Sequence, residues 1–482
     1  MDQPNILIFM TDHQRGDTVL PENPTLTPNV DRLAAEGATF AENYCPSPHC
    51  CPARATFHSG LYPQQTGIWN NVCNNQALQT SLNDGVRLWA EDLADAGYTQ
   101  SYIGKWHVNA DERPSQRGWQ RDEYATGLPG TLHGQTWERF RQLAADPPSA
   151  ETGDGRIIRP GWPGYKAYNE VNEEDHGDAG KVNQALEELD ILVKGDGPWS
   201  LCVNTSGPHD PYVVPQKYLD MYDPEDTELP PSFRDDLTDK PGIYRRQREQ
   251  IWGQMSEQEY REAVRHFRAY CTFMDDLFGR VLDRLDASGQ KDNTLVLYCS
   301  DHGDYCGDHG LFAKGIASFR GAYHVPAIIR WPAGIENPGR KIDELVSLAD
   351  FGPTFLEAAG ISVDREFAGT SLMPFLKNDA PENWREDLLM QCNGVELYYT
   401  QRILQTKAHK YVFNGFDFDE LYDLKKDPHE MVNVSEQKEY EAVKRDLVKR
   451  MWRNMKAVDD SAHNAYITVA LAPYGPALAF EE

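Results

Sequence analysis

A segment near the N-terminus, from Cys45 to Tyr62, combines residue types that could attack a charged ester. Cys50, Pro52 and Arg54 follow the pattern Cys-x-Pro-x-Arg, and the residues after them are compatible with a helix. Proline is favoured in the first helical turn, where backbone N–H groups without partners in the helix attract anions. We therefore expect Cys50 to be a nucleophile at the N-terminus of a helix.

Two other interpretations of these cysteines are open, a metal site and buried unreactive thiols, and a third, a phosphatase loop, is excluded by its spacing. Cys45, His49, Cys50 and Cys51 could bind a soft metal, but a structural zinc site needs four converging ligands, and no second Cys/His pair of suitable spacing lies nearby. A thiolate phosphatase loop needs a longer spacing than either Cys50 or Cys51 has to Arg54. Burial of unreactive thiols, which is common for free cysteine, is the second open interpretation. The rest of the chain must distinguish between them.

Four continuous apolar runs, of the kind buried on both faces of a parallel sheet, lead directly into polar residues. The runs and the residues after them are 5–10 with Asp12 and His13, 98–103 with Lys105 and His107, 199–204 with His209, and 294–299 with Asp301 and His302. Ligands of open parallel sheets bind outside the C-terminal ends of the strands. A single Asp or His after a strand is more often a turn residue, but four such ends in one chain predict a functional site.

The acidic residues at these ends, together with one histidine, predict a site for one divalent cation. Asp12 and Asp301 offer hard oxygen ligands, and His302 offers a nitrogen ligand. A cation would also offset the cost of gathering carboxylates in one cleft.

Basic residues predict that the same site holds a tetrahedral anion. Arg54, Lys105 and Lys314 would neutralise its charge, while His107 and His209 could transfer protons near neutral pH. The chemistry expected of this set is cleavage of a charged ester.

The elements that must position these residues alternate between strands and helices. Helices are predicted at 27–37, 84–96, 178–193, 259–285 and 346–359, and a further strand at 325–330. This alternation predicts an α/β protein whose parallel sheet is covered by helices on both faces. Two stretches, 146–175 and 215–257, have no clear period and are expected to border the pocket.

The chain is expected to divide into a catalytic α/β domain, residues 1–375, and a C-terminal subdomain, residues 376–482. Short strands at 397–400 and 410–413, followed by a helix at 435–455, indicate a small antiparallel sheet with one helix. The tail, residues 466–480, is more apolar than a free end should be. We expect it to pack on its own chain or on a second copy in a homo-oligomer.

The composition argues against several classes of partner. Of the 482 residues, 40% are hydrophobic and 11% aromatic, which is typical of a folded soluble protein. A net charge of −28 argues against nucleic acid or an anionic membrane as the main partner. The nine cysteines lack regular spacing, and neither a signal-like N-terminus nor a run of ~20 apolar residues is present. A cytoplasmic protein is therefore expected.

Motifs that span nearly the whole chain point to one family. They are Pro4-Asn-Ile-Leu-Ile, Thr27-Pro-Asn-Val-Asp-Arg-Leu-Ala, Cys50-Cys-Pro-Ala-Arg-Ala-Thr, Gly104-Lys-Trp-His, Pro208-His-Asp-Pro-Tyr, Ser300-Asp-His-Gly-Asp, Gly307-Asp-His-Gly-Leu-Phe-Ala-Lys-Gly315 and Glu420-Leu-Tyr-Asp-Leu-Lys-Lys-Asp-Pro428. In this order and combination the chain resembles the type I sulfatases of the alkaline phosphatase superfamily, a group that includes the phosphonate monoester hydrolases. The resemblance implies a large mixed, mostly parallel sheet sandwiched by helices, with a smaller C-terminal α+β subdomain.

The same resemblance implies that a formylglycine-generating enzyme converts Cys50 to formylglycine. The hydrated aldehyde has one hydroxyl for attack and a second that lets the group be released, which a thiol does poorly. By family analogy Asp301 assists the attacking hydroxyl, His209 protonates the leaving oxygen, and His107 helps the collapse. The charge-holding residues implied are Lys105, Lys314 and Arg54, and the implied cation ligands are Asp12, His13, Cys50, Asp301 and His302.

Two positions depart from the commonest family pattern. His13 stands where many members have a second acid, so we expect a weak ligand or a residue that lies behind the ligands. His302 stands where asparagine is frequent, as in phosphonate-ester-cleaving relatives. Its nitrogen makes Mn²⁺ an alternative to Ca²⁺ as the single divalent cation.

The reaction that the resemblance implies is hydrolysis of a sulfate monoester of a sugar, an aryl alcohol or an alkyl alcohol. A phosphonate monoester or phosphodiester hydrolase with the same residues is the first alternative. A non-catalytic binding protein on the same scaffold is the second.

Overall fold

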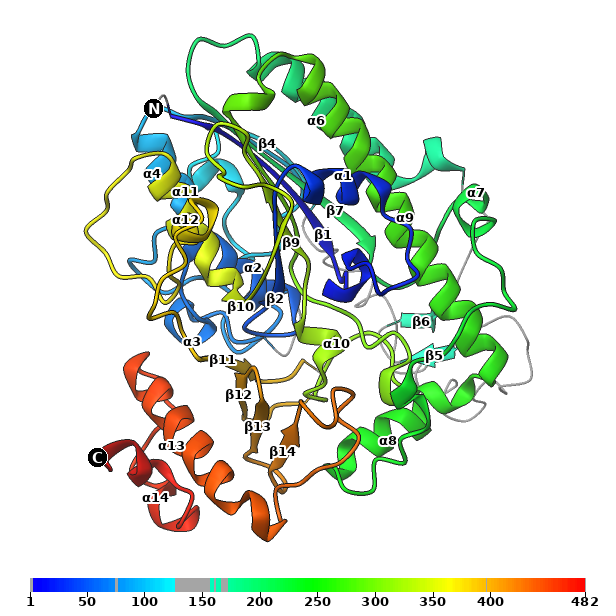
Figure 1. Ribbon diagram of the computed structural model, residues 1–482, viewed down its shortest axis with the longest axis vertical. Coiled ribbons are helices and arrows are strands. Elements are labelled where there is room, and N and C mark those ends of the chain that lie inside the picture. Colours follow the sequence, from blue (N-terminus) through cyan, green and yellow to red (C-terminus); the bar gives the residue numbers. More distant parts are fainter. Residues whose placement is uncertain are drawn as a thin grey trace.

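Eight strands form the central sheet of the computed structural model, in the order β10-β2-β9-β8-β1-β7-β3-β4 (Figure 1). The structure describes residues 3–73, 77–125, 157–159, 162–165, 172–395 and 397–481. Neighbouring strands of this sheet run parallel, except that β9 is antiparallel to both β2 and β8. The sheet is therefore mixed and mostly parallel, as the resemblance implies.

The strands of this sheet, in chain order, are β1 (Asn5–Asp12), β2 (Ala38–Tyr44), β3 (Thr99–Lys105), β4 (Arg121–Ala125), β7 (Trp199–Pro208), β8 (Thr294–Ser300), β9 (Ala327–Arg330) and β10 (Arg340–Ser347). A separate pair consists of β5 (Ile157–Arg159) and β6 (Trp162–Tyr165). The described α-helices before residue 376 are α1 (Pro28–Ala35), α2 (Cys50–Ser59), α3 (Pro63–Thr66), α4 (Trp89–Asp95), α6 (Gly177–Leu192), α7 (Gln216–Leu219), α8 (Gly242–Gln250), α9 (Glu257–Ala287), α10 (Arg320–Tyr323), α11 (Phe351–Ala358) and α12 (Met373–Leu376).

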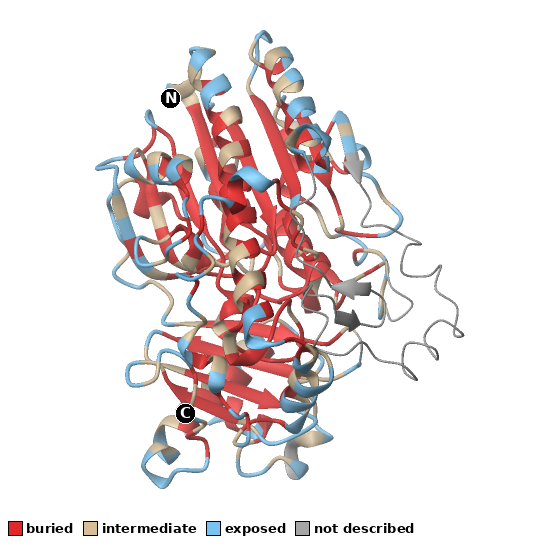
Figure 2. Ribbon diagram, turned by 90° about the vertical axis from the view of Figure 1, so that its right-hand side faces the viewer, coloured by how far each residue is buried: buried red, intermediate tan, exposed pale blue. Residues whose placement is uncertain are grey.

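Helices cover both faces of the sheet. α1, α6 and α9 pack together on one face, while α2, α4 and α11 pack together on the other (Figure 1). Every residue of β1 and of β8 is buried, because strands sandwiched between two helical layers have no exposed face (Figure 2). The longest helix, α9, begins with a capping box between Ser256 and Glu259, which pairs backbone N–H groups that the helix leaves open.

A smaller antiparallel sheet lies near the C-terminus. It consists of β11 (Asp387–Cys392), β12 (Gln401–Thr406), β13 (His409–Asn414) and β14 (Glu420–Asp423), in that order. The helix α13 (Glu441–Ala457) packs on this sheet, and α14 (Ile467–Ala470) follows it. Tail residues Leu478 and Ala479 are buried in the same hydrophobic cluster as Trp452 of α13. The tail therefore packs on its own chain, although Tyr466 and Phe480 stay exposed.

Several predicted element boundaries are wrong. The helix predicted at 346–359 begins only at Phe351, because Val346 and Ser347 pair with β2 in the edge strand β10 and residues Leu348–Asp350 form a short 3-10 helix. The helix predicted at 84–96 is shorter, α4, and the strand predicted at 397–400 lies just before β12. The stretch 215–257, predicted to be irregular, contains the helix α8. Most of the stretch 146–175 lies outside the described residues.

None of the described helices is both long enough and apolar enough to span a bilayer. No two of the nine cysteines, which all lie in described segments, form a disulfide.

Candidate active site

The four strands whose ends were predicted to carry polar chemistry are the four central neighbours β8, β1, β7 and β3. They are mutually parallel, so their C-terminal ends meet at one edge of the sheet. This topology gathers residues that are far apart in the sequence: Asp12 and His13 after β1, Lys105 and His107 at β3, His209 after β7, and Asp301 and His302 after β8.

Cys50 is the first residue of α2 and points toward this edge. Its Sγ lies 3.1 Å from His302 Nε2, 3.5 Å from Lys314 Nζ and 3.9 Å from Asp12 Oδ1. Burial alone would raise the pKa of the Cys50 thiol, but the nearby charges of Lys105 and Lys314 outweigh it and hold that pKa well below 9.0. The position is therefore suited to an anionic or electron-rich group.

One group of side chains can converge on a cation: Asp12, Cys50, Asp301 and His302. The inner carboxylate oxygens, Asp12 Oδ1 and Asp301 Oδ1, lie 3.5 and 3.7 Å from His302 Nε2. Neighbouring ligands on one divalent cation have about this separation, given metal–oxygen bonds of roughly 2.3–2.6 Å for Ca²⁺. His302 Nδ1 lies 3.1 Å from the carbonyl oxygen of Gly303, an arrangement that leaves Nε2 for the cation. The residues therefore fit the single cation that the resemblance implies.

The outer oxygens of the two carboxylates contact basic side chains. Arg54 Nε donates to Asp301 Oδ2 at 2.7 Å, and Lys105 Nζ donates to Asp12 Oδ2. Arg54 also donates to the carbonyl oxygen of Lys105 at 2.8 Å and to Asn204 Oδ1 at 3.2 Å. Burial would raise the pKa of Asp12, and Cys50 adds to this, but Lys105 and Arg54 lower it overall. Asp12 is thus held ionised, and both carboxylates are held in orientation by these bonds.

Two histidines and Lys314 lie on the other side of Cys50. His209 Nε2 is 2.7 Å from Lys314 Nζ, and both His107 and His209 interact with the Cys50 thiol. Burial and Lys314 would lower the pKa of His209, but the negative charges of Asp210 and Asp12 raise it above 6.5. The pKa of His107 is lowered by burial. The pKa values of the two imidazoles are therefore shifted in opposite directions from 6.5, that of His209 upward and that of His107 downward.

His13 lies outside the cation group of Cys50. It belongs to a second group, with His209 and Asp210, whose potential ligand atoms also lie close together. It touches the first group in two places: its backbone N–H donates to Asp301 Oδ1 at 3.2 Å, and its ring packs against that of His302, with centroids 4.6 Å apart. The structure thus places every other predicted ligand together and directs the His13 ring elsewhere.

Three residues of this region were not among those predicted. Asn204 holds Arg54, while Asp210 and Asp304 face the His13 ring. Asp210 belongs to the motif Pro208-His-Asp-Pro-Tyr, and Asp304 belongs to the motif Ser300-Asp-His-Gly-Asp. Their position in these motifs is the sequence feature from which they could have been predicted. Asn204 sits inside a strand and belongs to no such motif.

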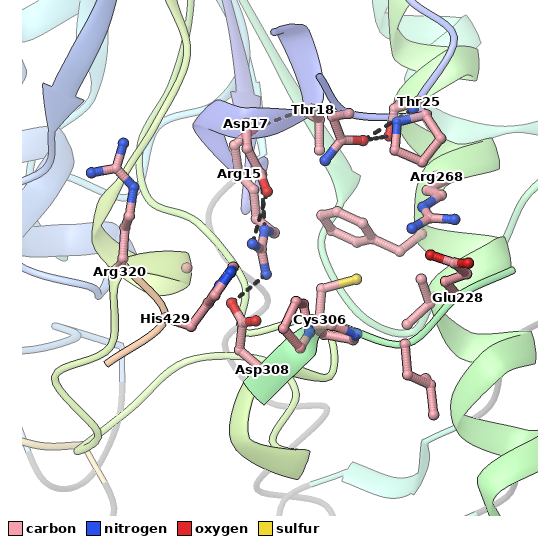
Figure 3. A pocket seen from close by; sticks show the side chains of 18 of the residues that line it. Arg15, Asp17, Thr18, Thr25, Glu228, Arg268, Cys306, Asp308, Arg320 and His429 are labelled. Carbon is pink, nitrogen blue, oxygen red and sulfur yellow. Dashed lines mark hydrogen bonds and ion pairs between the residues drawn. The ribbon is translucent and has the colours of Figure 1, made fainter. Parts of the chain in front are cut away.

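A cavity of about 470 Å³ is lined in part by segments that follow β1 and β8, and none of the predicted site residues lines it (Figure 3). Figure 3 shows Arg15 extending between Asp17 and Asp308, and it pairs with both at 2.7–2.9 Å. Because the basic and acidic groups at its centre pair with each other, this cavity does not identify the reactive centre.

Comparison with known families assigns the chain by sequence. The family model described as Sulfatase matches residues 4–361, and the model described as N-sulphoglucosamine sulphohydrolase, C-terminal, matches residues 307–457. The first match contains all the predicted site residues.

Individual proteins are similar over most of their length. The uncharacterized sulfatase YidJ of Escherichia coli (strain K12) is 31% identical over 454 residues, which cover 90% of this chain and 83% of that protein. The choline-sulfatase of Rhizobium meliloti (strain 1021) is 30% identical over 464 residues, with the same two coverages, 90% and 83%. The solved phosphonate monoester hydrolase of Agrobacterium radiobacter superposes with a TM-score of 0.77 at 22% identity, over 95% of this chain and 96% of that one. This last likeness concerns the fold.

Proposed function

The chain belongs to the sulfatase family, and we propose that it hydrolyses a sulfate monoester with residue 50, as formylglycine, supplying the nucleophile beside one divalent cation. The observation that supports this most is the position of Cys50. It stands at a helix N-terminus, with carboxylates and His302 on one side and Lys105, Lys314, His107 and His209 on the other. A tetrahedral anion at this point would meet positive charge on the lysine side and a cation on the carboxylate side.

Formylglycine hydrate at residue 50 would supply one hydroxyl for attack and a second for regeneration of the aldehyde. The side chains around it have separable roles. Arg54 holds Asp301 in place and contributes charge, and Asp12 and Asp301 present their inner oxygens to the cation. The cation, held by Asp12, Asp301, His302 and residue 50, would add polarisation of the ester.

We assign protonation of the leaving oxygen to His209. Its pKa lies above 6.5, and its side chain interacts with that of Cys50. Its Nε2 accepts a hydrogen bond from Lys314 Nζ at 2.7 Å in this structure, so it can hold a proton beside the reacting group once Lys314 turns to the bound anion. His107, whose pKa is lowered by burial, is suited to accept a proton when the hydrate collapses.

Mass spectrometry of the peptide that contains residue 50, combined with sulfate release, tests this mechanism. Protein made together with a formylglycine-generating enzyme should carry the aldehyde or its hydrate at residue 50 and release sulfate. Cys50→Ala should abolish release, while Cys51→Ala, which removes the neighbouring buried thiol, should retain it. Full activity in protein whose residue 50 is still a thiol would overturn the proposal.

Chelation tests the cation. Removal of divalent ions should lower sulfate release, and addition of Ca²⁺ or Mn²⁺ should restore it, because Asp12 and Asp301 would otherwise face each other across an empty centre. A rate that is unchanged after metal analysis shows complete removal would exclude a catalytic cation.

The second candidate is hydrolysis of a phosphonate monoester or phosphodiester by the same residues. The nitrogen of His302 in contact with Cys50 favours it, since that residue distinguishes this chain from sulfatases with asparagine there. Turnover of an aryl sulfate and of an aryl phosphonate monoester with the same leaving group separates the two. A large preference for the phosphonate would replace our assignment.

A further inference from the structure

We propose that Asp178, in the first turn of α6, positions His209 for proton transfer by holding a bulge in β7, the strand that leads to this histidine. The inference rests on the role proposed above for His209, protonation of the leaving oxygen. Asp178 binds the backbone of the bulge, so it is a positioning residue and not a catalytic one.

The bulge lies at the C-terminal end of β7, where this strand runs beside β1. Met10 of β1 pairs with Asn204 of β7. The next pair joins Asp12 to Pro208, so β7 has two residues more than β1 between these pairs. Extra residues bend a strand and redirect the side chains that follow, and such bulges are frequent beside active sites. His209 is the first residue after the strand, so the bulge determines where its imidazole lies.

The carboxylate of Asp178 accepts two consecutive backbone N–H groups of this bulge. The N–H of Ser206 donates to Oδ1 at 2.7 Å, and the N–H of Gly207 donates to Oδ2 at 2.8 Å. Asp178 is only 1% exposed, and hydrogen bonds to an ionised acceptor are stronger than those between neutral groups. Each carboxylate oxygen thus fixes one peptide group of the bulge.

Side chains of α6 and α9 hold the carboxylate of Asp178 in turn. Lys181, one turn later in α6, donates to Asp178 Oδ1 at 2.8 Å and to the hydroxyl of Ser206 at 2.7 Å. The hydroxyl of Tyr270, in α9, donates to Asp178 Oδ2 at 3.3 Å. A Cβ atom at Gly207 would collide with the Tyr270 ring, so the bulge packs closely against α9. The bulge therefore has a single position as long as Asp178 is in place.

A displacement of the bulge would be transmitted to His209 through the backbone. The N–H of His209 donates to the carbonyl oxygen of Ser206 at 3.1 Å, which closes a turn between the bulge and the histidine. A misplacement of about 1 Å in a catalytic site can lower a rate by about 100-fold. Loss of Asp178 should therefore weaken proton transfer by His209, the step that depends most on the leaving group.

The dependence of kcat/KM on the leaving group tests this role. A general acid contributes most when the departing oxygen is strongly basic, as in phenyl sulfate, and least when it is weakly basic, as in para-nitrophenyl sulfate. Asp178→Asn keeps the size of the side chain, but its NH₂ group would face one of the two backbone N–H groups. We expect kcat/KM of this variant to fall by about 10- to 100-fold with phenyl sulfate and by less than about 3-fold with para-nitrophenyl sulfate.

Asp275→Asn is the matched control. Asp275 is also 1% exposed and also accepts two consecutive backbone N–H groups, those of Asn29 and Val30, but these belong to α1. Its replacement should change kcat/KM for both esters by the same factor. Equal losses with the two esters in Asp178→Asn would overturn the proposal, because a merely structural role does not depend on the leaving group.

Lys181→Met is a milder variant of the same contact, for use if Asp178→Asn does not fold. Lys181 is partly exposed and touches both Asp178 and Ser206, so its loss loosens the bulge without removing the carboxylate. It should lower kcat/KM more with phenyl sulfate than with para-nitrophenyl sulfate. An equal effect on the two esters would also count against the proposal.

Amide hydrogen exchange separates this inference from the proposed function, since it needs no turnover. Exchange of the peptide that contains residues 206–209 should become about 10-fold faster in Asp178→Asn and stay unchanged in Asp275→Asn. Unchanged exchange there in Asp178→Asn would refute the inference whatever the reaction. A wild type that turns over aryl phosphonates but not aryl sulfates would contradict the proposed function alone, and the same two leaving groups would then be compared on the phosphonate.

Discussion

Arg54 forms hydrogen bonds with three separate parts of the site. Its guanidinium donates to the side chain of Asp301, to the backbone of Lys105 and to the side chain of Asn204, and it is fully buried. These partners follow or belong to three different strands, so the fork of one side chain sets the distances between β8, β3 and β7. A lysine has the charge but lacks the planar fork.

Arg54→Lys should therefore lower both stability and sulfate release. We expect a loss of about 2–4 kcal/mol in the free energy of unfolding, because two buried acceptors lose their donor. Denaturant titration measures this loss, and Arg32→Lys, at a half-exposed ion pair with Asp283, should change stability by no more than about 0.5 kcal/mol. Equal stability of the two variants would show that the buried fork is not needed.

The sequence indicates which residues carry chemistry better than it indicates which residues hold them. Cys50, Asp12, Lys105 and Asp301 could be predicted because they stand in motifs or directly after apolar runs. The direction of the His13 ring could not, because it follows from a backbone φ of 75° and from two carboxylates that come from other strands. Local pattern contains no information on such distances.

At the scale of elements, the pairing of β3 with β7 depends on a residue without a side chain. Gly104 has a φ of +95°, and a Cβ atom there would lie 1.9 Å from the carbonyl oxygen of Asn204. Gly104 pairs with Asn204 in the sheet and precedes Lys105, so a shift here would move both the lysine and the partner of Arg54.

Gly104→Ala should prevent normal folding or cost more than about 4 kcal/mol, a range reached by few single substitutions. Gly97→Ala is the matched control, since Gly97 has a φ of +91° but no atom within 4 Å of the added Cβ. It should cost only the left-handed backbone strain, about 1–2 kcal/mol. Thermal and denaturant unfolding measure the stability that each variant loses. A similar loss of stability in both variants would show that the contact between the added Cβ and the Asn204 carbonyl oxygen does not dominate.

Helix α1 is attached to α9 through a buried acid. Asp275 accepts hydrogen bonds from the backbone N–H groups of Asn29 and Val30, at 3.1 and 2.8 Å. Burial raises the pKa of Asp275 from 3.8 to about 6 despite these bonds. Between pH 4 and 6 the folded protein thus keeps a proton that the unfolded chain has lost, so this residue makes stability fall as the pH rises.

Asp275→Asn should remove that part of the pH dependence. Relative to the variant, the wild type should lose about 3 kcal/mol of stability between pH 4 and pH 6 and no more above it, since one pKa unit corresponds to about 1.4 kcal/mol. Denaturant midpoints at several pH values measure the difference. Asp283→Asn, at an exposed position of the same helix, should show the same dependence of stability on pH as the wild type. If Asp275→Asn also showed the wild-type dependence, Asp275 would not be its cause.

The alternation of apolar runs with helical patterns identified the four central strands and β9, predicted at 325–330, but not β2, β4 and β10 or the reversed direction of β9. β2 and β10 contain charged residues such as Glu42 and Arg340, which mask the apolar pattern of a strand. The direction of β9 is set by its pairing with β2 and β8, which no local pattern encodes. A strand could therefore be predicted from the sequence where both of its faces are buried, but not where one face is partly exposed.

At the scale of the whole molecule, the C-terminal subdomain supports the segment that contains Lys314. Lys410 of β13 donates to the carbonyl oxygen of Ser318 at 2.6 Å and pairs with Glu430. Cys392 of β11 contacts the carbonyl oxygen of Gly315 at 3.4 Å. The small sheet is thus part of what fixes the position of Lys314 beside Cys50.

Lys410→Met should cost about 3–5 kcal/mol, because it removes the ion-pair partner of the buried Glu430 and leaves that carboxylate with the backbone N–H of Arg320 as its donor. It should also lower sulfate release from protein that is still folded, through the loosened Ser318 segment. Lys407→Met is the control in the same subdomain, since Lys407 forms an exposed pair with Glu344 and should change stability by about 0–1 kcal/mol. Normal sulfate release by folded Lys410→Met protein would show that the C-terminal subdomain is not needed to position Lys314 in the site.

The strand order also determines when each strand can pair during synthesis, because the chain leaves the ribosome N-terminus first. β1 lies between β7 and β8, and β2 lies between β9 and β10, so both early strands wait for partners made much later. During that interval β1 and β2 are strands without partners, which makes them prone to pair with other chains. Cys50, only 2% exposed in the folded protein, is accessible to a modifying enzyme for the same interval. We therefore expect the conversion proposed for this residue to occur before folding is complete, and slowing translation between residues 60 and 290 should raise the modified fraction.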